Sequence, residues 1–238
     1  MAPAAHRQGW RPATAGATDH PDAANRTPRG RHARRSLGRT AEPKSTTIDP
    51  MQRNHSIALV ALFAALMAVL GLIPKIDLPF GVPITLQTLG VMLAGCLLGP
   101  RLALRALVLF LVAVAIGLPL LSGGRGGFGV FTTPAAGYLL AWPLGAFVAG
   151  LVMRTLPASS PRRVALSAFV ASAIGGLLVI HASGVVGLMK IAGMSFTQAL
   201  IATSAFVPGD LIKCVLTAVV CHTVARGLPD WKFGKQGA

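Results

Sequence analysis

Two oppositely charged side chains, Asp210 and Lys213, lie near the start of the mostly apolar stretch "FVPGDLIKCVLTAVVCHTV", residues 206–224. Residues i and i+3 share one face of a helix, so the carboxylate and the ammonium are expected side by side. Together they can recognise a ligand that presents adjacent donors and acceptors, such as an amide or a urea. The alternative is structural: Asp210 stabilises the helix start, and Lys213 pairs with it or extends toward the membrane surface.

A second candidate is Arg125, which lies in the glycine-rich stretch "SGGRGGFG", residues 122–129. A guanidinium can hold a carboxylate through two parallel hydrogen bonds. The stretch is not a phosphate-binding P-loop, because the Gly-Lys-Ser/Thr ending is absent. It therefore indicates either an anion-binding loop or only a turn.

The sequence favours neither a catalytic nor a metal site. His181 and Ser183 in "IHASG" are two residues apart, so on a helix they point in different directions. His181 is interpreted as a hydrogen-bonded interior histidine. Cys96, Cys214 and Cys221 show no CxxC spacing and are interpreted as small buried hydrophobic residues. We predict that the chain is not an enzyme and uses no cofactor or metal.

The composition indicates a membrane protein that crosses the bilayer several times. Of 238 residues, 53% are hydrophobic and 12% are charged, and the mean hydropathy is +0.64. The net charge of +15 does not indicate a nucleic-acid partner, because 10 of the 22 Lys and Arg residues lie within residues 1–55. These residues also hold 4 of the 7 acidic residues, so residues 1–55 carry a net charge of +6 and the much longer remainder carries +9.

Six apolar stretches are long enough, or nearly so, to cross about 30 Å of hydrocarbon. In lipid each should form a helix, because every backbone polar group needs a partner within the segment. We predict an all-α bundle of six transmembrane helices, with breaks between them such as "AGMSFTQ". The predicted spans are 57–73, 84–99, 102–120, 134–154, 163–189 and 207–226.

Three regions follow from this pattern. Residues 1–50, with few apolar side chains, are predicted to be a disordered basic tail that contains the twin arginine of "GRHARRSLGR". Residues 51–228 form the membrane domain, and residues 229–238 a cytoplasmic C-terminal tail. Met51 opens a stretch that resembles a natural start, so residues 1–50 are hypothesised to be absent from the native protein.

The basic residues predict the orientation, because cytoplasmic loops carry the excess of Lys and Arg. Of the 12 basic residues within residues 56–238, eight flank one side, three flank the other, and Lys213 lies within the last span. We therefore expect both termini in the cytoplasm and Asp210 near the outer face. The inner set is Arg101, Arg105, Arg154, Arg162, Arg163, Arg226, Lys232 and Lys235; the outer set is Lys75, Arg125 and Lys190.

Several motifs resemble the BioY family of biotin transporters, the substrate-capture (S) components of energy-coupling factor importers. They are "PITLQTLGVMLAGCLLGPR", "GLPLLSGGRGGFGVF" followed by "AAGYLLAWPLGAFVAGL", and "VPGDLIK", in that order. The resemblance covers about residues 55–226. One departure is "TTPAAGY", where the family commonly has Gly-Pro-Thr-Gly-Gly, so no ligand role is carried over to that turn.

The resemblance implies a six-helix bundle that binds biotin near the outer face of the bacterial plasma membrane. In the family, the Asp-x-x-Lys motif that matches Asp210 and Lys213 holds the ligand. The ureido ring of biotin has two N–H donors beside a carbonyl acceptor, which suits this pair. Arg125 is expected to neutralise the valerate carboxylate. Further expected contacts are Gln87, Thr85 and Tyr138.

The family also implies partners within the membrane. In many bacteria these are a transmembrane coupling protein and two ATP-binding subunits, although some members occur without them. Small residues on the first span recur at helical spacing, as Ala61 with Ala65 and Ala64 with Ala68. They are expected to contact the coupling protein or to pack within the bundle. Two other functions remain open: capture of another vitamin, and a membrane assembly subunit without a ligand.

Overall fold

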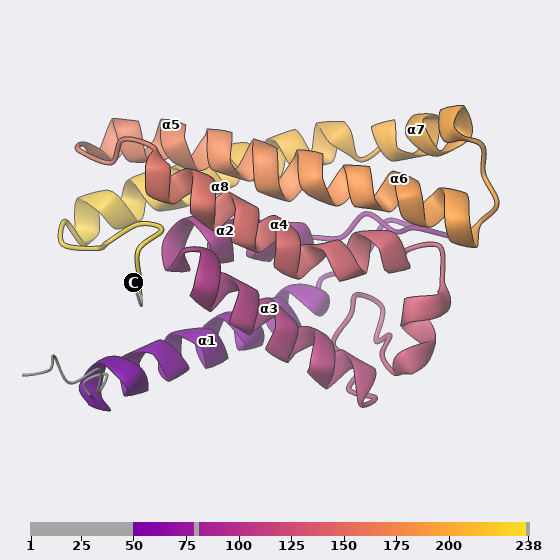
Figure 1. Cartoon of the computed structure of the whole chain (residues 1–238), viewed down its shortest axis with the longest axis horizontal. Helices are drawn as coiled ribbons and strands as arrows, with labels where there is room; N and C mark the ends of the chain where they lie inside the picture. The colour runs from indigo at the N-terminus through magenta and orange to yellow at the C-terminus, as the bar shows by residue number, and fades with distance from the viewer. Residues whose placement is uncertain (1–49, 79–80, 237–238) are drawn as a thin grey trace, which may run out of the picture. The chain divides into compact units, whose positions relative to one another are not determined.

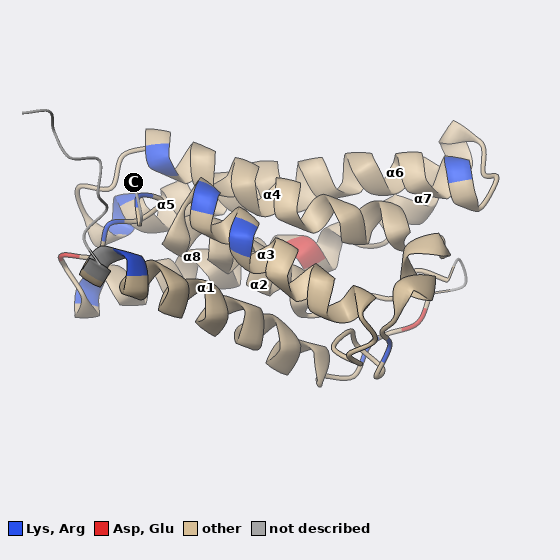
Figure 2. Ribbon diagram, turned by 60° about the horizontal axis from the view of Figure 1, so that its bottom comes forward, with Lys and Arg blue, Asp and Glu red and all other residues tan. Residues whose placement is uncertain are grey.

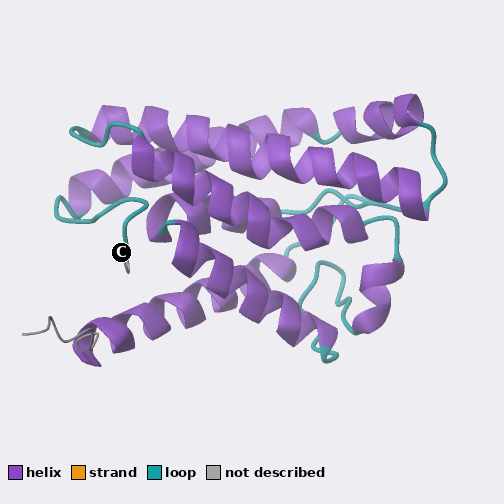
Figure 3. Ribbon diagram, viewed as in Figure 1, coloured by secondary structure: helices purple, strands orange, loops and turns teal. Residues whose placement is uncertain are grey.

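The computed structural model describes residues 50–78 and 81–236, so the predicted tail, residues 1–50, lies outside the described residues except for Pro50. The described residues are helical, which confirms the predicted all-α class, and within them only two isolated β-bridges form (Figures 1 and 3). The α-helices are α1 (Pro50–Gly71), α2 (Gln87–Leu98), α3 (Pro100–Ala115), α4 (Ala136–Thr155), α5 (Pro161–Ala171), α6 (Ile180–Ile191), α7 (Phe196–Ser204) and α8 (Val207–Gly227). A 3-10 turn, η1 (Phe128–Thr132), precedes α4, and a π-helical segment, η2 (Ser172–Val179), joins α5 to α6.

Four helical stretches within the described residues are long and apolar enough to cross a membrane. They are Arg53–Gly71, Ala136–Thr155, Pro161–Ile191 and Val207–Gly227. The predicted spans 84–99 and 102–120 correspond to shorter helices, α2 with 12 residues and α3 with 16. At 1.5 Å per residue these are about 18 and 24 Å long, less than the hydrocarbon thickness. The predicted count of six crossings is thus not established by helix length.

Local sequence explains where several helices begin. Pro100 and Pro161 occupy the first turns of α3 and α5, where the missing N–H leaves no bond unmade. The break predicted at "AGMSFTQ" is shorter than expected, because α7 begins within it. Ser195 caps α7 and forms a reciprocal capping box with Gln198.

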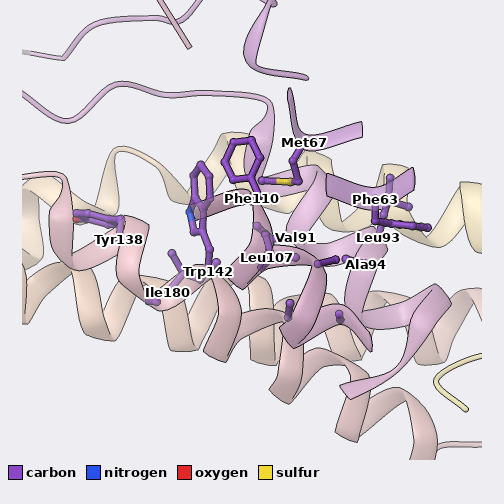
Figure 4. Close-up of a cluster of buried hydrophobic side chains, with 14 of the residues drawn as sticks. Phe63, Met67, Val91, Leu93, Ala94, Leu107, Phe110, Tyr138, Trp142 and Ile180 are labelled. Atoms are coloured by element: carbon purple, nitrogen blue, oxygen red, sulfur yellow. The ribbon is translucent and has the colours of Figure 1, made fainter. Parts of the chain in front are cut away.

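Helix α2 lies at the centre of the bundle and packs against α1, α3, α4 and α8. Its side chains are buried along nearly its whole length, which explains an apolar sequence without a polar face. Figure 4 shows part of the core that surrounds it, where Met67, Val91 and Phe110 lie near Trp142. The central position of α2 matters because its first turn reaches the polar site described below.

Glycines allow α4 to pack directly against η2 and α6. A Cβ added to Gly145 would lie 2.7 Å from the carbonyl oxygen of Gly175. A Cβ added to Gly184 would lie 2.1 Å from the ring of Tyr138. Such distances exclude any larger residue without rearrangement, so these glycines set how closely the two long helical stretches approach.

The two ends of the bundle differ in charge. Most of the Lys and Arg residues gather at the end where the described C-terminus lies (Figure 2). At this end the predicted C-terminal tail packs on α2: the Trp231 Nε1–H donates to the carbonyl of Leu97 at 3.2 Å, and the Gly234 N–H donates to that of Cys96 at 3.0 Å. These bonds occupy carbonyls that the end of α2 leaves free.

Candidate ligand-binding site

A buried carboxylate, that of Asp210, is held by three side chains from three different helices. Its Oδ1 accepts hydrogen bonds from Lys213 Nζ at 2.7 Å and from Thr88 Oγ1 at 3.1 Å. Its Oδ2 lies 2.8 Å from His181 Nε2, which donates because an ionised carboxylate can only accept. The residue is only 4% exposed. The charge is thus stabilised by directed bonds rather than by water.

Lys213 lies one turn beyond Asp210 on α8 and is 6% exposed. Besides Asp210, its ammonium donates to Thr88 Oγ1 at 2.8 Å. The three residues therefore form a closed triangle, confirming that the i, i+3 pair shares one helix face. An ammonium has three N–H groups, and two of them are used here, so one remains for a further acceptor.

Aromatic rings surround the histidine side of this cluster. The rings of Tyr138 and Phe206 lie 6.3 and 6.2 Å from that of His181, centre to centre. The hydroxyl of Tyr138 is 2.6 Å from Thr203 Oγ1, which ties α4 to α7. These contacts exclude water from one side of the Asp210 carboxylate and fix the orientation of the imidazole.

The cluster lies at the base of a pocket whose mouth is formed by the loops between α1 and α2 and between α3 and α4. The space between its walls, including the open mouth, is about 640 Å³. Asp210, Lys213 and His181 contribute polar groups to an otherwise largely apolar wall. The predicted contacts Arg125, Gln87, Thr85 and Tyr138 also line this pocket. A site with these properties suits a small organic molecule with an apolar body and a compact polar group.

Gln87 makes more protein contacts than the sequence suggests. Its Nε2 donates to the carbonyls of Met67 and Leu120 at 3.1 and 3.0 Å. Its Oε1 accepts from the Ser122 N–H at 3.2 Å and lies 3.4 Å from the Ser122 hydroxyl. The amide thereby joins the end of α1 to the glycine-rich loop, so its geometry favours positioning the loop over direct contact with a ligand.

Arg125 is held within that loop at the pocket wall. Its Nε donates to the carbonyl of Ser122 at 3.3 Å, and its backbone pairs with Leu121. Within residues 50–78 and 81–236, no carboxylate forms an ion pair with the guanidinium. Because Ser122 is in turn bound by Gln87, the position of this cation depends on the Gln87 amide.

A sequence model of the BioY family matches residues 42–230. The chain belongs to the BioY family. It is 47% identical over 178 residues to the biotin transporter BioY of Rhizobium etli, covering 74% of this chain and 95% of that protein. It is 46% identical over 191 residues to the biotin transporter BioY of Rhodobacter capsulatus, covering 76% of this chain and 97% of that protein.

The fold of this BioY-family chain is also similar to a crystal structure of the S-component for biotin from an ECF-type ABC transporter. The TM-score is 0.68 at 29% identity, and the match covers 75% of this chain and 95% of the other. The family resemblance read from the sequence motifs is therefore confirmed, and the bundle is a membrane-transporter fold.

Two members of the polar cluster were not among the predicted site residues. Thr88 sits beside Gln87 in a quoted family motif, but nothing in its spacing predicted contact with a residue 122 positions away. His181 was correctly interpreted as a hydrogen-bonded interior histidine, although its partner was not identified. The presence of one histidine and one carboxylate, each within an apolar run, is the signal that could have indicated this pairing.

The alanines of α1 in this BioY-family chain divide into two pairs. Ala61 and Ala65 are exposed, on the same side of α1 as the exposed Leu62. Ala64 and Ala68 are partly buried and pack against the core of the bundle. Of these two pairs, only Ala61 and Ala65 therefore lie open to a neighbouring molecule. Ala64 and Ala68 instead pack within the bundle, which is the other arrangement that the sequence allowed.

Proposed function

We propose that this chain captures biotin from the outer side of the bacterial plasma membrane, as the S component of an importer. The observation that carries the proposal is the buried Asp210 and Lys213 pair at the base of a small-molecule pocket, in a chain of the BioY family. Intramembrane charges are disfavoured unless they serve a function or are fully paired. Here the pairing is close, yet unused donor and acceptor positions remain toward the pocket.

The ureido ring of biotin matches those remaining positions. The Asp210 carboxylate has about four acceptor sites, and three are occupied by Thr88, Lys213 and His181. One site is free for a ureido N–H, and the third N–H of Lys213 is free for the carbonyl. The apolar wall suits the thioether ring, as expected for a pocket with few polar groups.

The valerate carboxylate is proposed to bind Arg125 at the pocket mouth. The support is that the two terminal amino groups of this guanidinium make no hydrogen bond within the described residues, while its Nε is anchored to Ser122. A bidentate bond to a carboxylate requires such free, pre-positioned amino groups. Tyr138 and Thr85 are proposed as packing contacts along the wall, and Gln87 as the residue that holds the loop.

We further propose six membrane crossings with both termini in the cytoplasm. The support is the gathering of basic residues at the end of the bundle that carries the C-terminus, which is the charge bias of cytoplasmic ends (Figure 2). In this arrangement α2 and α3 are shorter than the hydrocarbon thickness, and the loops that flank them complete each crossing. The pocket mouth then faces outward, together with Lys75 and Asp77, which form an ion pair there.

The proposed protein partners are a transmembrane coupling protein and two ATP-binding subunits. The exposed Ala61 and Ala65 support a helix-on-helix contact with the first of these, since small residues let helices approach closely. Helices α1 and α8 also expose large apolar side chains, including Leu62, Val69 and Val215, which suit contact with lipid or with a membrane partner.

Equilibrium binding of labelled biotin to the purified chain in detergent tests the proposal. A dissociation constant in the nanomolar range is expected, and an excess of unlabelled biotin should displace the label. Displacement by a different vitamin at a lower concentration than biotin would instead support the alternative of another substrate. Absence of binding to any vitamin would support an assembly subunit without a ligand.

A further inference from the structure

One buried donor has no partner in the protein. The Trp142 indole is 6% exposed, and its Nε1–H is the single buried side-chain nitrogen or oxygen in the described part of the chain that lacks a hydrogen bond. Trp231, by contrast, donates its Nε1–H to the carbonyl of Leu97. Buried donors are almost always paired in native proteins, so an unpaired one requires an explanation.

The unpaired donor lies at the proposed ligand pocket. Trp142 is one of the side chains that line it. Its ring packs against Phe110 at 6.1 Å between centroids. In Figure 4 the nitrogen lies on the side of the ring nearer Tyr138 and Ile180, which also line the pocket. The indole N–H therefore lies on the side of the ring toward other pocket-lining residues and has no acceptor among the described residues.

Trp142 and Lys213 line the pocket from two different helices, α4 and α8. The two residues lie equally far from the starts of α4 and α8, about 9 Å along each axis. The two helices start at the same end of the bundle, because the Tyr138 hydroxyl bonds to Thr203, just ahead of α8. The pocket thus has two donors on different walls: the remaining N–H of Lys213 and the indole N–H of Trp142.

We propose that Trp142 Nε1 donates a hydrogen bond to the carbonyl oxygen of the bound cyclic urea, alongside Lys213. The inference rests on the proposed function and extends it to a residue that recognises the ligand. A carbonyl oxygen has two lone pairs and accepts two such bonds. One ring N–H of the ligand then faces the free acceptor site of Asp210, so the carbonyl and one N–H of the urea both find partners. A ligand without this acceptor leaves the indole N–H unpaired.

Trp142→Phe tests the proposal, because it keeps an aromatic ring and removes only the donor and part of the ring. Biotin affinity should fall roughly threefold to tenfold, the effect of one net hydrogen bond. Trp231→Phe is the matched control: it removes an indole N–H at the opposite end of the bundle and should leave biotin affinity unchanged. Both variants are measured in the same detergent, with thermal unfolding as the check on folding.

A second ligand separates hydrogen bonding from packing. In 2-iminobiotin the carbonyl oxygen is replaced by an imino group that is protonated near neutral pH and cannot accept. Trp142→Phe should therefore weaken biotin binding roughly threefold to tenfold but should not weaken 2-iminobiotin binding. The preference for biotin over 2-iminobiotin should fall by at least that factor. Equal weakening of both ligands would mean that Trp142 only packs, and would overturn the proposal.

A spectroscopic measurement covers the case in which Trp142→Phe does not fold. In the ¹⁵N-labelled wild-type chain, the indole N–H resonance of Trp142 should shift downfield on addition of biotin, while that of Trp231 should not move. An unshifted Trp142 resonance at saturating biotin would overturn the inference. If wild-type protein failed to bind biotin at all, the proposed function would fall first; if it binds and Trp142→Phe binds equally, only this inference falls.

Discussion

Replacing Asp210 with asparagine tests the central carboxylate with almost no change in volume. The carboxylate accepts three hydrogen bonds, from Lys213, Thr88 and His181. Asparagine keeps one accepting oxygen but places an NH2 donor at the other position, where it faces either His181 Nε2 or the two donors on Oδ1. The negative charge that balances the Lys213 ammonium is also lost.

The expected loss follows from these contacts. The ligand N–H that Asp210 would accept is a charge-assisted bond, worth about 1.5–3 kcal/mol. Removing it should weaken biotin binding on the order of tenfold to a hundredfold. Stability should fall as well, because the ammonium of Lys213, only 6% exposed, is left without a counter-charge.

The assay is equilibrium binding of labelled biotin to purified variants, together with thermal unfolding of the ligand-free protein. Asp230→Asn is the matched control, since Asp230 is exposed and lies outside the pocket. Combining Asp210→Asn with Lys213→Met should recover part of the lost stability, because the unpaired ammonium is removed, but should not recover biotin binding. Such non-additive stability is expected of directly bonded residues.

Unchanged biotin affinity in a folded Asp210→Asn variant would refute the reasoning, because the carboxylate would then not contact the ligand. Recovery of binding in the double variant would also contradict it. In that case the charge pair would be a structural element, as in the alternative in which Asp210 only starts the helix.

Three further outcomes are expected. Arg125→Gln should weaken the binding of biotin at least tenfold but leave the affinity for biotin amide unchanged, as measured by competition binding. The control Arg105→Gln should change neither affinity. Equal loss of affinity for both ligands would contradict a role of Arg125 in binding the carboxylate. Ala65→Trp should abolish co-purification with a coupling protein while sparing biotin binding. Leu166→Trp, on the exposed side of α5, is the control and should permit both. Co-purification of the Ala65→Trp variant with the coupling protein would refute the contact. Gln87→Met should lower the free energy of unfolding by about 1–3 kcal/mol, because two backbone carbonyls and Ser122 lose their hydrogen-bond partner. Chemical denaturation measures this change. An unchanged denaturation midpoint would show that the amide does not hold the loop.

The sequence alone determined features that depend on neighbouring residues or on composition. Apolar runs in a chain with 12% charged residues predicted a helical membrane protein, because lipid leaves no other partner for the backbone. The spacing of Asp210 and Lys213 predicted that they meet, because helical geometry brings i and i+3 together. The order of the motifs predicted the family. All of these inferences need only local geometry or overall composition.

Helix lengths were less predictable. The runs 84–99 and 102–120 are mostly apolar, yet α2 and α3 are shorter than these runs. The turn at Gly99, with φ of +88°, and the positive φ of Gly117 place the ends of these helices. Hydropathy cannot distinguish an apolar residue within a helix from one in a packed loop, because both are buried from water.

The tertiary structure decided which distant residues complete the site. Thr88 and His181 reach Asp210 from α2 and α6, across 122 and 29 residues of sequence. The role of Gln87 also depends on the fold, since its partners lie on α1 and in the glycine-rich loop. Helix periodicity predicts which way a side chain faces on its own helix, but not which helix lies opposite. That is set by packing, here by glycines that let α4 and α6 approach closely.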